Sequence, residues 1–255
     1  MPAMRILQYR DWSHFKAEYV GDLFADGIFR VGDYVFRGQS DDAWPLETSF
    51  DRWFRIRYKD QAGDRLAIAD SLIREFRAEL TRRYPKHEAL IGAESEIIAL
   101  AQHFGVPTRL LDWSASPYIA AFFSFSDAVS LSMTSKGVAI WALRKDAPIW
   151  NSEAGVALIE LPGGGNERLR EQLGCFTLNR TPYRTLEEYV GASPEEPLAL
   201  LKAVIPTEEA SIALADLDAM GINHVTTFPE VVGCALAAQL RVLIGRAGES
   251  KASVA

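Results

Sequence analysis

Apolar side chains recur every three or four residues along several stretches of the chain, a spacing that predicts amphipathic helices. The first such stretch spaces Trp12, Phe15 and Tyr19 in this way. A serine N-cap, Ser116, followed by Pro117 at the first helical position marks another helix start. Helices are expected at residues 11–24, 64–83, 93–104, 117–128, 208–221 and 228–246, with a short one near 166–173.

Continuous apolar runs rich in β-branched residues predict buried strands. These runs cover residues 137–144, 155–162, 175–180 and 199–206, and an earlier one ends at Phe36. Helices dominate the first half, and strands with irregularly interposed helices dominate the second. We therefore expect an α+β fold with one central sheet, mixed or mostly antiparallel, flanked by helices. No convincing linker divides residues 1–255, so a single domain is expected.

Composition narrows the class of protein. Of 255 residues, 48% are hydrophobic and 24% charged, as in ordinary globular proteins, and the net charge of −7 opposes broad nucleic-acid binding. A basic exception at residues 52–59 is interpreted as a solvated, partly helical surface. No apolar run approaches the roughly 18–20 residues of a membrane span, so a cytoplasmic protein without membrane contact is expected. Cys175 and Cys234 are expected to be small packing residues.

Familiar cofactor and metal motifs are missing from the sequence. There is no GxxxxGK[ST] phosphate loop, no GxGxxG after a strand, no HExxH and no CxxC. The glycine run at 163–165 is more simply a flexible loop. The sequence therefore indicates neither a metal site nor a resident cofactor.

Polar side chains gather in a segment otherwise predicted to be buried. Burying such groups costs free energy unless each finds a partner, so a dense cluster favours a functional site. The alternative is an internal hydrogen-bond network, with Arg109 and Asp112 as a structural ion pair and His103 as a core histidine. The cluster consists of Gln102, His103, Thr108, Arg109, Asp112, Trp113, Ser114 and Ser116.

An arginine and a glycine follow a buried strand at residues 34–39, "YVFRGQ". Gly38 suits close approach of a ligand or of another backbone segment, and it also suits a tight turn. We expect Arg37 to point inward, toward the polar cluster, where Asp112 or a ligand phosphate satisfies it. A second polar concentration lies near Gln172.

Four stretches together resemble the FRG domain family: "FRGQ", "AQHFGVPTRLLDWSASPYIAAFFSF", "RLREQLGCF" and "FPEVVG". The resemblance spans about residues 30–240, and the central stretch is its most specific part. The family is bacterial and phage-borne. By association, the resemblance implies a toxin or antiviral defence component, with a protein partner or antitoxin as regulator.

A more distant likeness connects the chain with ADP-ribosyltransferase-like folds, which hold NAD at a split sheet. These folds carry three sequence elements: an arginine or histidine at the end of an early strand, a serine or threonine before a helix, and a glutamate or glutamine at the start of a late strand or turn. The likeness implies that Arg37 is the first and binds NAD, that Ser114 belongs to the second, and that Gln172 or Glu171 is the third. NAD would be a substrate rather than a cofactor, and Trp113 or Phe104 would stack on its nicotinamide or adenine ring. The residues expected to take part in catalysis are Arg37, His103, Ser114, Gln172 and Glu171, and those expected to bind the ligand are Arg37, Gly38, Gln39, Gln102, Thr108, Arg109, Asp112 and Trp113.

Three functions stay open at this point. The first is an effector that acts on NAD or a related nucleotide by ADP-ribosyl transfer or glycohydrolysis. The second is a non-catalytic nucleotide-sensing or protein-interaction module that uses the same cluster. The third is a nucleic-acid-processing enzyme built on His103, Asp112 and the basic stretch 52–59, which the acidic net charge disfavours.

Overall fold

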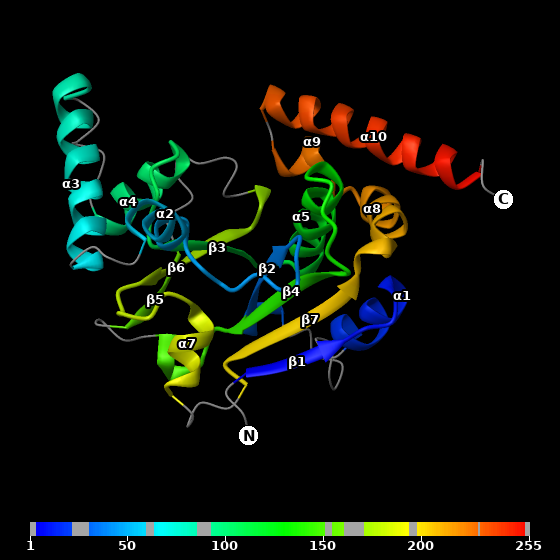
Figure 1. Ribbon diagram of the computed structural model, residues 1–255, viewed down its shortest axis with the longest axis horizontal. Helices are drawn as coiled ribbons and strands as arrows, with labels where there is room; N and C mark the ends of the chain where they lie inside the picture. The colour runs from blue at the N-terminus through cyan, green and yellow to red at the C-terminus, as the bar shows by residue number, and fades with distance from the viewer. Residues whose placement is uncertain are drawn as a thin grey trace.

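A seven-stranded sheet forms the centre of the computed structural model (Figure 1). The structure describes residues 4–21, 31–59, 64–85, 93–150, 155–160, 171–193, 198–228 and 230–252. The strand order is β1-β7-β4-β2-β3-β6-β5. The strands are β1 Met4–Gln8, β2 Tyr34–Gln39, β3 Leu110–Ser114, β4 Gly137–Arg144, β5 Val156–Ile159, β6 Gly174–Asn179 and β7 Leu200–Pro206.

The sheet is mixed, with β1 parallel to β7 and all the other pairs antiparallel. This confirms the expected α+β fold with a mixed, mostly antiparallel sheet. The pairing of β2 with β3 is registered at Phe36 and Ser114 alone, whereas β2 pairs with β4 over its whole length. The two strands therefore separate beyond this pair, and the sheet opens between β2 and β3.

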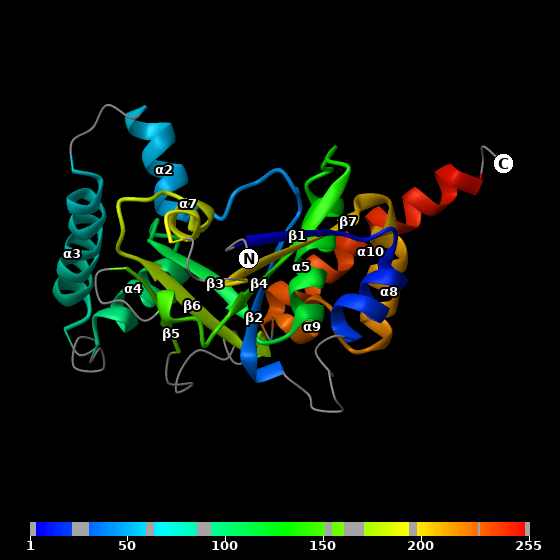
Figure 2. The same cartoon turned by 90° about the horizontal axis from the view of Figure 1, so that it is seen from below.

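Two groups of helices flank the sheet on either side of this opening (Figures 1 and 2). Helices α2, α3 and α4 lie toward β3, β6 and β5, and helices α1, α5, α8, α9 and α10 lie toward the other strands. The helices are α1 Trp12–His14, α2 Ser49–Tyr58, α3 Arg65–Arg83, α4 Glu94–His103, α5 Pro117–Ser130, α7 Leu186–Gly191, α8 Ala210–Ala219, α9 His224–Thr227 and α10 Val231–Ala252; short turns of other helix types are η1 Phe15–Val20, η3 Val31–Asp33, η5 Pro148–Trp150 and η6 Thr207–Glu209.

Helices α4 and α5 cover neighbouring parts of one face of the sheet. Phe36 on β2 packs into the cluster that includes α5, and Leu110 on β3 packs against Ile97 of α4. Ser114 is paired with Phe36, and residues two apart on a strand share a face, so Leu110 and Ser114 lie on that same face. The space between α4 and α5 thus lies directly above the junction of β2 and β3.

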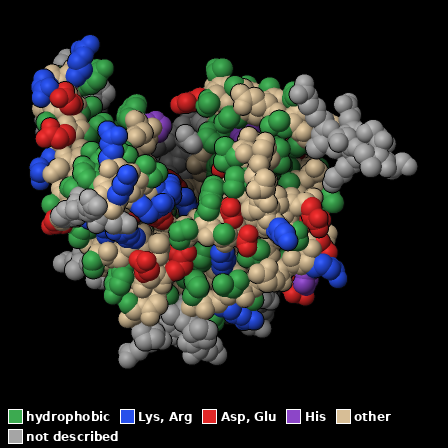
Figure 3. Space-filling model, viewed as in Figure 1, with side chains coloured by type: hydrophobic (Ala, Val, Ile, Leu, Met, Phe, Trp, Pro, Cys, Tyr) green, Lys and Arg blue, Asp and Glu red, His purple; other side chains and the backbone are tan. Residues whose placement is uncertain are grey.

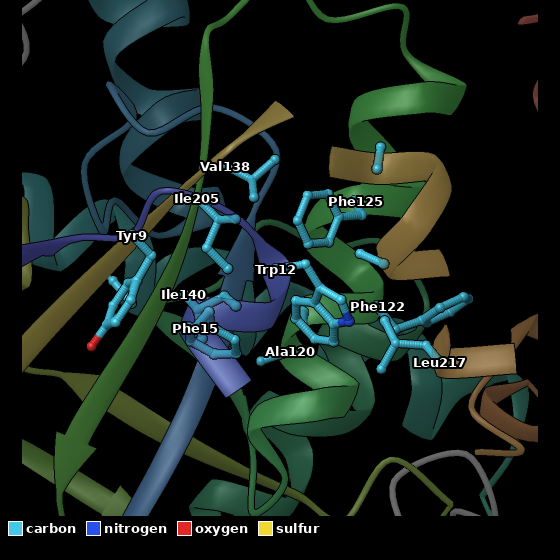
Figure 4. Packing of buried hydrophobic residues seen from close by; sticks show 14 of the residues in the cluster. Tyr9, Trp12, Phe15, Ala120, Phe122, Phe125, Val138, Ile140, Ile205 and Leu217 are labelled. Atoms are coloured by element: carbon cyan, nitrogen blue, oxygen red, sulfur yellow. The ribbon is translucent and has the colours of Figure 1, made fainter. Parts of the chain in front are cut away.

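The largest apolar cluster joins the N-terminal helix to α5 and α8 (Figure 4). Trp12 is fully buried there, stacks on Phe15, and meets Phe125 edge to face. Its indole Nε1 donates a 2.7 Å hydrogen bond to the Asp216 carboxylate on α8, so its polar atom is satisfied. This packing fixes α5 against the sheet, since buried aromatic rings dominate core energetics.

The arginine–glycine pair of the first motif lies within β2 itself. The expectation that the strand ends at Phe36 is wrong, because pairing with β4 continues through Gln39. A Cβ on Gly38 would stand 1.9 Å from the carbonyl oxygen of Ala120 on α5. Gly38 is therefore required by the close approach of another backbone segment, one of the two readings the sequence left open, and a turn is ruled out.

Most of the predicted helices are confirmed within a few residues, and the helix start at Ser116 is confirmed by its hydroxyl accepting from the Ile119 amide. Residues 161–170, which carry the glycine run and most of the expected short helix, lie outside the described residues. Cys175 is buried as expected, whereas Cys234 is exposed, so the packing role predicted for it is wrong. Across the ranges described, the helices are too short or too polar to cross a bilayer.

Candidate functional site

A cavity of about 350 Å³ lies between α4 and α5, over the opening between β2 and β3. The surface is hollowed between the two groups of helices, with basic side chains beside the hollow (Figure 3). Phe36, Ala120, Phe123 and Phe176 contribute apolar wall. The polar side chains around it come from β2, α4, β3, α5 and the segment before β6: Arg37, Gln102, His103, Asp112, Ser114, Asp127 and Gln172. The structure thus brings together residues separated by up to 135 positions (172 − 37).

Arg37 bridges the two separating strands. By strand alternation it shares the face of its pairing partner Trp141, yet its Nη1 donates a 2.8 Å hydrogen bond to the backbone carbonyl of Asp112 on β3. Nη1 also lies 3.6 Å from the Asp112 carboxylate. The guanidinium therefore occupies the opening itself and points toward the polar cluster, as the sequence predicted.

Two donor nitrogens of Arg37, Nε and Nη2, make no hydrogen bond to the described residues. The Nε atom is also buried. A buried donor left unpaired costs free energy, so its retention calls for an explanation. Asp112 does not close the pair, because its side chain is 61% exposed against 21% for Arg37.

The electrostatics of Arg37 combine burial with charges of both signs. Burial lowers the pKa of its guanidinium, and the Asp112 carboxylate opposes that effect. The nearby Arg52 lowers the same pKa further, and Asp127 raises it. An arginine that is buried, close to another cation and only partly paired attracts an anionic ligand more strongly than a solvated one.

A chain of hydrogen bonds holds Asp112 in place. The Thr108 hydroxyl donates to Oε1 of Gln102, and Gln102 Nε2 donates over 2.7 Å to Oδ1 of Asp112. Thr108 is itself fixed by Ser49, whose Oγ accepts from the Thr108 amide at 3.0 Å. These residues thus form an internal hydrogen-bond network, the alternative to a functional site that the sequence left open. The network orients the Asp112 carboxylate beside Arg37.

Ser114 and Gln172 both line the cavity and lie next to each other. Ser114 Oγ donates a 2.8 Å bond to the backbone carbonyl of Gln172, and accepts one from the Ser116 amide. The Gln172 amide nitrogen donates to the Thr227 carbonyl at the end of α9, over 3.1 Å. Both side chains are therefore anchored, and they fix the ends of β3 and β6 relative to α9.

Several predicted site residues lie elsewhere. Arg109 pairs with Asp70 of α3 at 2.7 Å and lines a separate cavity with Thr108, so the predicted Arg109–Asp112 ion pair is not formed. Gln39 is buried, accepts from the Trp141 indole and donates to the Pro45 carbonyl. Glu171 is exposed and does not line the cavity.

Two aromatic residues expected to stack on a ligand ring are placed differently. The Trp113 side chain is buried in the core on the opposite face of the sheet, and its Nε1 donates to Thr177 over 2.9 Å. Phe104 is 68% exposed and meets the ring of His103 edge to face. His103 is exposed and lines the cavity, so the alternative of a core histidine is wrong.

Asp127 is the charged residue of the main cavity that was not predicted from the sequence. It lies on α5, on the same helix face as Ala120 and Phe123. Its side chain is exposed at the surface, yet partial desolvation by the surrounding groups raises the pKa of its carboxyl, and Arg37 counteracts the rise. The sequence pattern could have indicated this residue. Asp127 is the one charged residue in "PYIAAFFSFSDAV", and it follows Ala120 by seven positions and Phe123 by four, which places all three on one helix face.

A second hollow of about 230 Å³ adjoins the first and shares Arg37, Gln102 and Asp112 with it. Its own lining includes Arg52 on α2, whose Nη1 donates to the Glu47 carbonyl. The site is therefore extended, with two arginines along one side. Among the described residues no three His, Cys, Asp or Glu side chains come together as a metal site would require.

Comparison with known families places the first motif and the polar cluster in one domain. The family model of the FRG domain matches residues 32–131, which include Arg37, Gly38, Gln102, Asp112 and Asp127. No curated protein matches, and no solved structure matches. The likeness to ADP-ribosyltransferases stays a prediction. The chain carries an FRG domain, whose name-giving arginine and glycine build the opening of the sheet and the wall of this cavity.

Proposed function

We propose that this FRG domain binds NAD or a closely related nucleotide in the cavity between α4 and α5, with a phosphate against Arg37. The proposal rests on the incomplete hydrogen bonding of the Arg37 guanidinium. The guanidinium is held by one hydrogen bond to the Asp112 carbonyl, while its Nε has no partner among the described residues. Arginine donors arranged in a fork suit phosphate oxygens, so a ligand phosphate would complete this site.

The dimensions and lining support a nucleotide. Ligand pockets are commonly about 300–1,000 Å³, with apolar walls and few well-placed polar groups. The main cavity, of about 350 Å³, and the adjoining hollow, of about 230 Å³, together fall in this range. Phe123 and Phe176 offer apolar surface to a base or nicotinamide ring, and Arg52 offers a second cation beside Arg37.

Nucleotide binding has firmer support than catalysis by Glu171 or Gln172, which the ADP-ribosyltransferase likeness implies. That likeness requires a carboxylate or amide from Glu171 or Gln172 at the reacting centre. Glu171 lies outside the cavity lining, and the Gln172 amide is tied to the Thr227 carbonyl. A role as toxin or antiviral defence component, with a protein regulator, is part of the proposal that rests on the family resemblance alone.

Isothermal titration of the purified chain with NAD, ADP-ribose and AMP tests the proposal. We expect binding by the wild type and at least tenfold weaker binding by Arg37→Ala, since charge-assisted bonds contribute about 1.5–3 kcal/mol each. Arg57→Ala is the matched control, because Arg57 is exposed on α2 and lines neither hollow. Thermal unfolding of each variant checks that the fold is retained. Equal affinities for Arg37→Ala and wild type contradict the proposal.

A salt titration separates this function from nucleic-acid processing. α2 carries Arg52, Arg55 and Arg57, which could contact a phosphate backbone. Binding of an oligonucleotide through several phosphates weakens steeply as salt rises. We expect the chain to bind NAD at 150 mM salt and to retain no oligonucleotide there. The reverse pattern supports the nucleic-acid alternative.

A further inference from the structure

Two carboxylates of the described residues line the main cavity, and their surroundings differ. Asp112 accepts a hydrogen bond from Gln102, and its main-chain carbonyl accepts from Arg37, so it is held in one position. Asp127 accepts no side-chain hydrogen bond from any described residue, although Arg37 is near enough to affect its pKa. The Asp127 side chain is exposed to solvent where it lines the cavity, so its carboxylate can meet a ligand or a water molecule there.

The position of Asp127 follows from the packing of α5 on β2. Because Gly38 has no side chain, the helix backbone at Ala120 lies directly against the strand. The helix face that carries Ala120, Phe123 and Asp127 then forms one wall of the cavity. The carboxylate is thus supplied by a rigid helix, which holds a side chain more precisely than a loop does.

We propose that Asp127 is the catalytic carboxylate of this site, acting as general base for hydrolysis of the N-glycosidic bond between nicotinamide and ribose. This inference rests on the proposed binding of NAD and names a reaction for it. With Arg37 on a phosphate, the ribose would lie between β2 and α5, where Asp127 can hold a water molecule. Asp127, rather than Glu171 or Gln172, would then supply the catalytic carboxylate.

The reaction balances with water as the second substrate. The water oxygen forms a bond to ribose C1′, and the bond from C1′ to the nicotinamide nitrogen breaks. The bonding pair passes to that nitrogen and neutralises its positive charge, so neutral nicotinamide leaves. The proton of the water passes to Asp127 and then to solvent, and ADP-ribose remains. The Asp127 carboxylate also stabilises the positive charge that develops on the ribose ring.

The titration behaviour of Asp127 agrees with this role. Desolvation raises the pKa of its carboxyl, and a base is more effective when its pKa lies nearer the working pH. The ionisable side chains that share the cavity are Arg37 from β2, His103 from α4 and Asp112 from β3. Of these, Arg37 lowers the pKa of Asp127, because its positive charge stabilises the ionised carboxylate.

Measurement of nicotinamide release from NAD by chromatography tests the inference, with binding measured in parallel by calorimetry. We expect the wild type to release nicotinamide and Asp127→Asn to release it about 10²–10⁴-fold more slowly, the contribution typical of a general base. NAD affinity should change less than fivefold. Glu75→Gln, an exposed carboxylate on α3 outside the cavity, is the control and should match the wild type.

The outcomes distinguish this inference from the binding proposal. Wild-type protein that binds NAD and releases no nicotinamide overturns the role of Asp127 and leaves binding intact. Release by Asp127→Asn at the wild-type rate overturns it as well. Failure of the wild type to bind NAD overturns both. A slow Asp127→Asn that still binds, together with a wild-type rate that rises with pH through a single carboxyl ionisation, supports it.

Discussion

Gly38 of β2 lies against Ala120 of α5 so closely that a Cβ at position 38 would stand 1.9 Å from the Ala120 carbonyl oxygen. The same Cβ would stand 2.9 Å from the Ser124 amide nitrogen. Helix and strand therefore touch backbone to backbone at this point. The neighbouring residue, Arg37, reaches across the opening of the sheet to Asp112. One short motif thus sets both the separation of α5 from the sheet and the cation of the cavity.

Substitution of Gly38 tests this close packing. Gly38→Ala should lower the free energy of unfolding by about 2–3 kcal/mol, because overpacking a rigid contact forces the helix to move. Urea denaturation followed by circular dichroism measures the loss. Gly191→Ala is the control, since a Cβ there meets nothing within 4 Å. A Gly38→Ala protein as stable as the control would contradict the backbone contact.

The buried ion pair of Arg65 and Asp51 holds α3 to α2. Asp51 is 1% exposed, and Arg65 also donates to the Thr181 carbonyl over 2.7 Å. Arg65→Ala leaves a buried carboxylate unpaired, so we expect a loss of about 3–5 kcal/mol in the free energy of unfolding. Arg82→Ala breaks an exposed pair with Glu79 and should cost under about 1 kcal/mol. Similar losses for the two variants would argue against a structural role for Arg65.

The two cysteines should differ in reactivity. Burial raises the pKa of the Cys175 thiol to about 12, whereas Cys234 is exposed on α10. The thiolate is the reactive species, so iodoacetamide at pH 7.5 should modify one thiol in the native protein and two in guanidinium. Mass spectrometry identifies the modified residue. Rapid native modification of Cys175 would contradict its burial.

The Asp127 carboxyl should make stability depend on pH. Its folded-state pKa lies above the unfolded value, so the folded protein is destabilised once this group ionises. Asp127→Asn should therefore be more stable than the wild type at pH 7.5, by no more than about 1 kcal/mol because the side chain keeps solvent contact. The difference should shrink as the pH falls toward 4. Urea denaturation at several pH values measures it, and a pH-independent difference contradicts the raised pKa.

Much of the fold follows from local sequence. β4 occupies the predicted residues 137–144, and α3 begins one residue after its Asp64 cap and ends before Pro85. β3 was missed, because "LLDWS" is only five residues long and lies among polar residues. β1 was missed too, since it is a short edge strand paired only with β7. Propensity does not reveal such strands, which form through distant partners.

The candidate site was predictable in part. Arg37, Gln102, His103, Asp112, Ser114 and Gln172 were singled out, and all of them line the cavity. Thr108 and Gln39 look the same in sequence but satisfy internal hydrogen bonds. Which way Arg109 points depends on Asp70, a residue of α3 that sequence distance hides. Asp127 was overlooked because its importance arises from the packing of α5, not from a motif.

A crystal structure of the wild-type chain with ADP-ribose, the product of the proposed hydrolysis, shows whether the cavity binds a nucleotide through Arg37. We expect the ligand between α4 and α5, with a phosphate oxygen within about 3 Å of an Arg37 guanidinium nitrogen and the ribose C1′ facing Asp127. An empty cavity at saturating ADP-ribose, or ligand bound elsewhere while Arg37 contacts only Asp112, would contradict binding through Arg37.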